Sequence, residues 1–136
     1  MTTPARSIPF VSHGWPHQSA HQGGPRIVAA TDPAVTGFSE PASRDGKRLY
    51  IAVFAGSQRT GGYEIRVAGV ERAGDTLTVR ALFVAPAPDA LTTQMLTSPA
   101  HLVSIERQSA TGAREVVLVD QSETERARGA VPQSQL

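Results

Sequence analysis

From residue 48 onward, apolar side chains recur at every second position, which is the spacing of β-strands and not of helices. The run 49–55 is apolar on both faces, so it predicts a central strand that is covered on each side. In residues 63–68, Tyr63, Ile65 and Val67 alternate with Glu64, Arg66 and Ala68, which is typical of a half-exposed strand. A compact Arg72–Asp75 turn and a further alternating run, 77–83, then predict a hairpin.

Shorter stretches complete the expected fold. Residues 8–11, 26–30, 102–106 and 115–119 favour further strands, and Gly69 interrupts the alternation where a β-bulge fits. Asp32 and Pro33 suit the N-cap and first position of one short helix that ends near Phe38. We therefore expect an all-β fold, a small antiparallel β-sandwich or partly open barrel of about six or seven strands with at most one short helix.

The length of 136 residues favours one domain. We expect a flexible N-terminus over residues 1–7 and a single β domain over residues 8–120. Residues 121–136 are polar and charged without an apolar period, which predicts a disordered polar tail.

Composition narrows the classes of function. The chain has 13 basic and 12 acidic residues and a net charge of +1, so no nucleic acid is expected as a partner. It has no cysteine, which excludes disulfides, zinc thiolate sites and a cysteine nucleophile. No apolar run reaches signal-peptide or transmembrane length, so we expect no membrane contact and a cytoplasmic chain as written, or an exported one if a leader was removed.

The stretch 56–63, Gly-Ser-Gln-Arg-Thr-Gly-Gly-Tyr, joins two β-like runs. Two adjacent glycines predict a tight turn or a close approach by another chain. Tyr63 is open to two interpretations: an aromatic that caps the core, or an anchor in a contact surface. The connection that ends at Pro99 is also long, and such connections are either functional or packed down by their own side chains.

A metal site is suggested by one spacing only. His13, His17 and His21 are four residues apart, as on one face of a helix, but Gly14 and Pro16 lie between them and disfavour that helix. We therefore predict no metal and no cofactor. His101 begins an apolar run and is interpreted as a structural histidine.

No pattern in the sequence indicates nucleophilic catalysis. Ser57, Ser98 and Ser104 stand outside any Gly-x-Ser-x-Gly elbow. Glu64 and Glu71 are seven positions apart on an expected strand, hence on opposite faces, and cannot act as a carboxylate pair. We expect no enzymatic activity.

Two stretches of the chain resemble one known family. Ile51–Gly56 followed by Gln58–Tyr63 resembles the apolar strand, glycine and Pro-Thr-Gly-Gly-Tyr loop of the PrcB-type protease-complex subunit, in its C-terminal domain, with Arg59 where the family usually has proline. Thr93–His101 resembles the second signature of that family, a Thr-Gln-Ala-Leu-Thr-like run that leads to proline. A weaker likeness extends the resemblance over residues 8–120.

The resemblance implies a noncatalytic module that binds or stabilises a partner protein, with a protease among the candidates. The candidate contact residues are Gln58, Arg59, Thr60, Gly61, Gly62 and Tyr63 in the glycine loop, and Thr93, Gln94, Thr97 and Pro99 in the 92–99 connection. Two alternatives stay open: a protease inhibitor that uses a chagasin-like loop, and a β domain that binds a small molecule. The oligomeric state is also open, because an exposed strand at a sheet edge can support a homodimer.

Overall fold

The structure, a computed structural model, describes residues 6–14, 23–31, 48–87, 89, 91 and 97–132. Strands make up most of these ranges. They are β1 (Arg6–Ile8), β2 (Val11–Gly14), β3 (Arg26–Ala30), β4 (Arg48–Phe54), β5 (Glu64–Ala73), β6 (Thr76–Val84), β7 (Ala100–Glu106), β8 (Glu115–Val119) and β9 (Glu125–Ala130). One 3-10 helix, η2 (Arg107–Ala110), follows β7.

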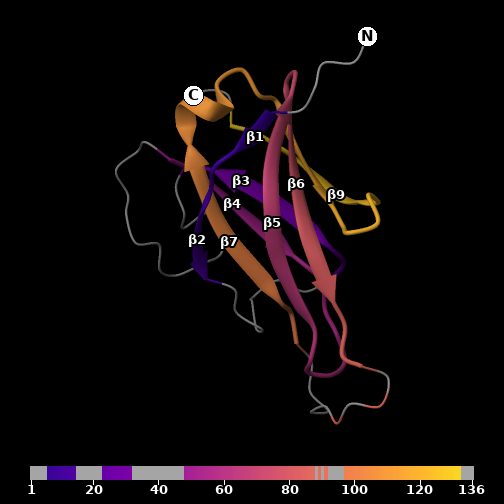
Figure 1. Ribbon diagram of the computed structural model, residues 1–136. Coiled ribbons are helices and arrows are strands. Elements are labelled where there is room, and N and C mark those ends of the chain that lie inside the picture. Colours follow the sequence, from indigo (N-terminus) through magenta and orange to yellow (C-terminus); the bar gives the residue numbers. More distant parts are fainter. Residues whose placement is uncertain are drawn as a thin grey trace.

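The strands form two sheets that pack face to face. One sheet has the order β1-β5-β6-β8-β9 and the other the order β2-β7-β4-β3. The long β5–β6 hairpin runs in front of β3 and β4 (Figure 1). The fold is therefore an all-β sandwich and not a closed barrel, which confirms the predicted fold class.

The two long sides of the sandwich are built differently. On one side, β1 and β2 are separated only by Pro9 and Phe10, and they pair with strands of different sheets. On the other side, β9 approaches β3 so closely that a Cβ built on Gly129 would lie 2.8 Å from the Ile27 carbonyl oxygen. The edge strands of the two sheets thus lie next to each other on both sides, β1 with β2 on one and β9 with β3 on the other.

Strand β4 lies between β3 and β7, and its side chains are buried on both faces, as the apolar run predicted. Leu49, Ile51 and Val53 face the other sheet and are each 0% exposed. They belong to the main core, whereas Tyr50 and Phe54 belong to a separate apolar cluster on the opposite face of the same sheet.

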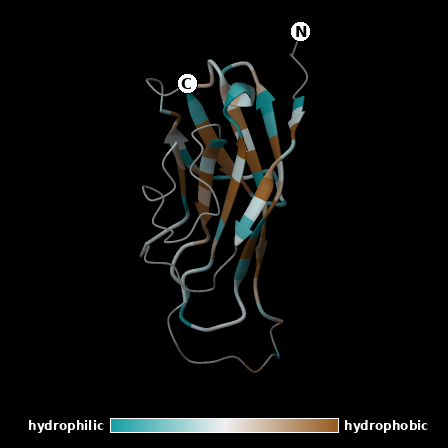
Figure 2. Cartoon of the chain, turned by 90° about the vertical axis from the view of Figure 1, so that its left-hand side faces the viewer, coloured by the Kyte–Doolittle hydropathy of each residue, from teal (hydrophilic) through white to brown (hydrophobic). Residues whose placement is uncertain are grey.

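The β5–β6 hairpin also follows the sequence pattern. Its pairing runs from Glu64 opposite Val84 to Ala73 opposite Thr76, and the register shifts between Val67 and Gly69. The β-bulge predicted at Gly69 is therefore confirmed. Hydrophobic and hydrophilic residues alternate along the strands (Figure 2), as expected for sheets with one face on a core.

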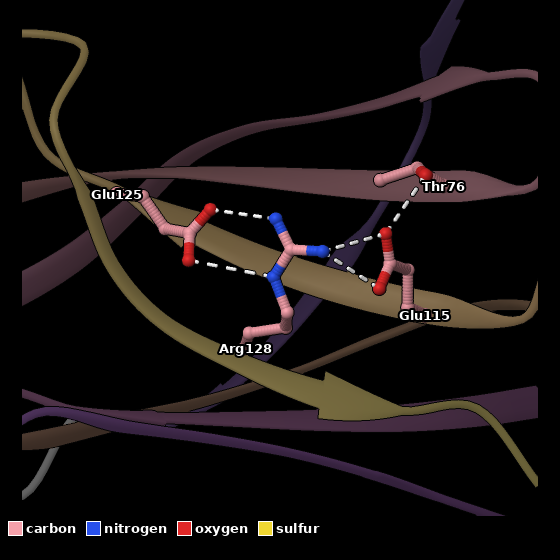
Figure 3. A network of polar contacts seen from close by, with 4 residues as sticks. All are labelled: Thr76, Glu115, Glu125 and Arg128. Carbon is pink, nitrogen blue, oxygen red and sulfur yellow. Dashed lines mark hydrogen bonds and ion pairs between the residues drawn. The ribbon is translucent and has the colours of Figure 1, made fainter.

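Ion pairs cover the outer face of the five-stranded sheet. Arg128 of β9 lies between Glu115 and Glu125, at 2.9 and 2.8 Å, and Thr76 donates a hydrogen bond to Glu115 (Figure 3). The hydrogen bond from Arg128 lowers the pKa of the Glu125 carboxyl, and both side chains are solvated. Exposed pairs of this kind contribute little to stability, so they indicate a solvated face and not a site.

Three expectations are wrong. The described residues hold nine strands, not about six or seven. Strands β6 and β8 are parallel, because Arg114 donates a backbone hydrogen bond to Asp75 and so begins β8 beside the start of β6. The tail from residue 121 is not disordered throughout, since β9 pairs with β8 and Val131 is only 2% exposed.

Strand β1 begins at Arg6, inside the segment expected to be flexible, and pairs with β5. The helix expected from Asp32 to Phe38 lies outside the described residues. Within those ranges, no helix is long and apolar enough to cross a membrane.

Candidate functional site

The glycine loop and the end of the 92–99 connection lie side by side at one end of the sandwich. Gln58 and Thr97 form an isolated antiparallel bridge, in which each backbone amide donates to the other carbonyl at 2.8 Å. The Thr97 hydroxyl also donates to the Thr60 carbonyl at 2.8 Å. The structure therefore brings together two stretches whose hydrogen-bonded residues Thr60 and Thr97 are 37 positions apart in sequence.

The segment Thr97–Pro99 packs beneath the glycine loop and is buried. Thr97 and Ser98 are 6% and 5% exposed, and Pro99 is buried and accepts a hydrogen bond from the Ala55 amide at 3.0 Å. Thr97 and Pro99, which the sequence proposed as contact residues, thus hold the loop and offer little surface of their own. Thr93 and Gln94 lie outside the described residues.

A close backbone approach occurs at Gly56, outside the glycine pair from which the sequence predicted one. Its φ is +97°, and an added Cβ would lie 3.1 Å from the Gly23 carbonyl oxygen. The next residue completes the contact: the Ser57 amide donates to the Gly23 carbonyl at 2.8 Å, and the Gly23 amide donates to the Ser57 hydroxyl at 3.1 Å. This side of the loop is therefore fixed by backbone packing against the start of β3.

The other end of the loop turns at Gly62, whose φ is +91°, whereas Gly61 has no positive φ. Arg59 and Gly62 are exposed, and Tyr63 is half-buried, as are Gln58, Thr60 and Gly61. Only Gly62 of the glycine pair therefore adopts the left-handed conformation that favours glycine. Arg59, Gly62 and Tyr63 are the residues of the loop best placed to meet a partner.

Apart from the glycine loop, the structure shows a cluster of polar groups around His101 that sequence patterns did not reveal. The imidazole is 4% exposed, its Nδ1 accepts a hydrogen bond from the Val67 amide at 2.8 Å, and its Nε2 lies 2.7 Å from the Ser12 hydroxyl. Burial lowers the pKa of His101 to about 4, with Arg66 adding to the effect, so the ring is neutral at pH 7. Since Nδ1 accepts, Nε2 carries the proton and donates to Ser12. His101 therefore cannot take a proton from Ser12 in this arrangement.

Another histidine–serine pair lies on the opposite face of the same sheet. The Ser104 hydroxyl lies 2.7 Å from His13 Nε2 and accepts a hydrogen bond from Arg48 Nε at 2.6 Å. Burial, and then the charge of Arg48, lower the pKa of His13. Because Ser104 is 0% exposed, its hydroxyl faces protein groups and not substrate. The partners of these groups are about 56 to 91 residues apart, a separation with no local sequence signal.

The histidine spacing considered in the sequence does not form a helix where it can be followed. His13 lies in β2, and His17 and His21 are outside the described residues. In the part of the chain that the structure covers, no three His, Asp or Glu side chains gather as a metal would require.

These features define a small β-sandwich domain with a glycine loop fixed by backbone hydrogen bonds. The family model described as PrcB C-terminal matches residues 49–106, from β4 to the end of β7, and this match supports the family resemblance seen in the sequence. The match includes the glycine loop and its bridge partner Thr97. Neither the curated proteins nor the solved structures gave a match.

Proposed function

We propose that this domain is a noncatalytic protein-interaction module, which binds or stabilises a partner protein through the loop of residues 57–63. The observation that carries the proposal is the double hydrogen bond between Gln58 and Thr97, because it fixes the loop before any partner arrives. A loop held in one conformation loses less entropy on binding, so more of its contact energy appears as affinity.

The residues on the loop suit such a contact. Arg59 is exposed and Tyr63 is half-buried, and arginine and tyrosine are enriched among the residues that dominate binding energy at interfaces. The exposed backbone at Gly62 has no side chain to keep a partner at a distance. The loop thus offers a cation, an aromatic ring and accessible peptide groups close together.

The family suggests which partner to test first. The PrcB-type subunit after which the family is named is an accessory subunit of a protease complex, so a protease is the first candidate. Support for this partner comes from the family resemblance, while support for the contact surface comes from the geometry of the loop.

Site-specific photocrosslinking tests the surface directly. A photoreactive amino acid in place of Arg59 should crosslink the partner in the source cells, and mass spectrometry should identify it. The same amino acid in place of Gln108, exposed on η2, is the matched control. Gln108 lies beyond Glu106, which pairs with Arg48 at the opposite end of β4 from the loop. Equal crosslinking from both positions would contradict the proposed surface.

Purified variants provide the second arm. Tyr63→Ala and Arg59→Glu should each weaken binding of the identified partner by about tenfold or more. Arg114→Glu, an equal charge change on an exposed residue far from the loop, should bind like the wild type. If the partner is a protease, undiminished cleavage of its substrate in the complex separates an accessory module from a loop inhibitor.

A further inference from the structure

Strand β6 extends further than the strand beside it. The β6–β8 pairing ends at Arg80 opposite Val119, whereas β6 continues to Val84. On its other side, β6 remains paired with β5 up to Val84. Residues 81–84 therefore have a strand neighbour on one side, and β8 does not reach them on the other.

A side chain takes the place of the missing strand. The Phe83 amide donates a hydrogen bond to Gln121 Oε1 at 3.0 Å, and Gln121 Nε2 donates to the Phe83 carbonyl at 2.9 Å. These are the two hydrogen bonds that a residue of an adjacent antiparallel strand would exchange with Phe83. The carboxamide of Gln121 thus shows that an amide group fits this edge, in a position exposed to solvent.

The residues on either side of Phe83 are apolar and exposed. Leu82 is 44% and Val84 is 41% exposed, and they are two of the four exposed large hydrophobic residues in the described ranges. As alternate residues of one strand, they lie on the same face of the sheet. A strand beside them would cover both with side chains from two alternate positions.

This edge lies at the same end of the sandwich as the glycine loop. Glu64, which follows Tyr63 directly, pairs with Val84, and both strands reach this end together (Figure 1). A polypeptide that contacts the loop can therefore continue along β6.

We propose that the edge of β6 at residues 82–84 docks an extended segment of a partner polypeptide, which displaces the Gln121 carboxamide and forms the same two hydrogen bonds with Phe83. The segment carries apolar side chains at the two positions flanking the residue that pairs with Phe83, where they cover Leu82 and Val84. This inference rests on the proposed function, since it specifies how part of the partner binds.

A second copy of this chain suits the edge less well. If two β6 strands paired antiparallel with Phe83 opposite its own copy, the copy's Ala85 would lie opposite Ala81. That position is next to Asp120, where the β8–β9 turn already runs. A partner segment is under no such constraint, because its chain can turn away at this point.

A synthetic peptide of the stated pattern tests the edge. The probe is acetyl-Thr-Lys-Val-Thr-Val-amide, which ends opposite Leu82, titrated into the ¹⁵N-labelled full chain and followed by NMR. We expect shifts at the Phe83 amide and the Gln121 side-chain amide. Gln121→Ala should bind about tenfold tighter, since no hydrogen bonds to Phe83 have to be broken first. Leu82→Lys should weaken binding, and Gln108→Ala, an exposed glutamine at the other end, should not change it.

The same peptide N-methylated at the amide of the threonine between the two valines is the matched probe control, because it cannot donate to the Phe83 carbonyl. Equal affinity of both peptides would overturn the proposal, and this comparison requires only the wild-type chain. Absence of binding up to about 1 mM in both wild type and Gln121→Ala would overturn it too, without touching the crosslinking result at position 59. Self-association of Gln121→Ala without peptide, seen by sedimentation, would replace the partner segment by a second copy.

Discussion

The backbone amide of Val67 in β5 donates a hydrogen bond to Nδ1 of His101 in β7, at 2.8 Å, and thereby joins the two sheets through their core. Val67 is the residue at which the β5–β6 register shifts, and His101 also contacts Ser12 of β2 through its other nitrogen. One neutral imidazole therefore connects three strands. Its protonation state matters because a protonated ring has two donors and no acceptor for the Val67 amide.

Acid should destabilise the fold through His101. The pKa of its imidazole is lowered from 6.5 to about 4 in the folded protein, mainly by burial, so between these values the unfolded chain binds more protons than the folded one. The free energy of unfolding then falls as the pH drops through this window, and the contribution is fully present above pH 6.5. We expect a loss of up to about 3 kcal/mol.

Urea unfolding of wild type and His101→Asn across this pH range measures the effect. Asparagine can place an acceptor near the Nδ1 position but does not titrate, so its curve should be flatter. Groups that do not interact with His101 titrate alike in both proteins and cancel in the difference, whereas Glu64 and His13, whose charges act on His101, contribute to it. Direct NMR titration of the His101 ring gives an independent check, and a pKa near 6.5 in the folded wild type would contradict the prediction.

The pattern of apolar residues was sufficient to predict where most strands lie in the sequence, but not which strands pair with one another. Strands β3 and β8 occur at the predicted residues because short apolar runs bounded by turns are local signals. The parallel pairing of β6 with β8 depends on where the chain returns after η2, which no local pattern records. Strand β9 was missed because Arg128 and its neighbours form an exposed edge with little apolar alternation.

Gly129→Ala should destabilise the protein by about 1–3 kcal/mol. The added Cβ would lie 2.8 Å from the Ile27 carbonyl oxygen, a backbone atom, so β9 and β3 would have to separate. Gly69→Ala is the matched control, because its Cβ would meet nothing within 4 Å and its φ is not positive. Thermal unfolding of both variants is the measurement. Equal melting temperatures would mean that β9 does not pack against β3 as described.

The C-terminal strand provides a further test. A chain that ends after Asp120 loses β9 and Val131, which is 2% exposed and donates its amide to the Arg114 carbonyl at 2.9 Å. We expect it to lose cooperative unfolding, whereas a chain that ends after Pro132 should unfold like the wild type. Val131→Ala should cost about 2 kcal/mol in the full chain. A fully stable chain ending at Asp120 would restore the interpretation of this segment as a dispensable tail.

The candidate site was only partly predictable. The two family signatures contain both partners of the Gln58–Thr97 bridge, so the sequence pointed to two segments that lie together in the fold. It assigned Thr97 and Pro99 to the contact surface, although both are buried. It also gave no indication of Gln121, because the role of that side chain depends on β6 extending beyond β8.

Thr97→Val tests whether the loop is preorganised by the segment beneath it. Valine keeps the shape of threonine but removes the hydroxyl that donates to the Thr60 carbonyl at 2.8 Å, while the backbone bridge to Gln58 stays possible. We expect a loss of about 1 kcal/mol in stability. Hydrogen exchange at the Gln58 amide should become faster by up to about fivefold, because the loop opens more easily.

The informative result concerns partner affinity. Thr97 is 6% exposed, so its hydroxyl offers almost nothing to a partner. A weaker complex of Thr97→Val would therefore report the entropy of ordering the loop and not a lost contact. Thr111→Val, an exposed threonine at the other end, is the control and should change neither exchange nor affinity. If Thr97→Val speeds exchange at Gln58 but binds the partner like the wild type, the fixed conformation of the loop is not what the partner recognises.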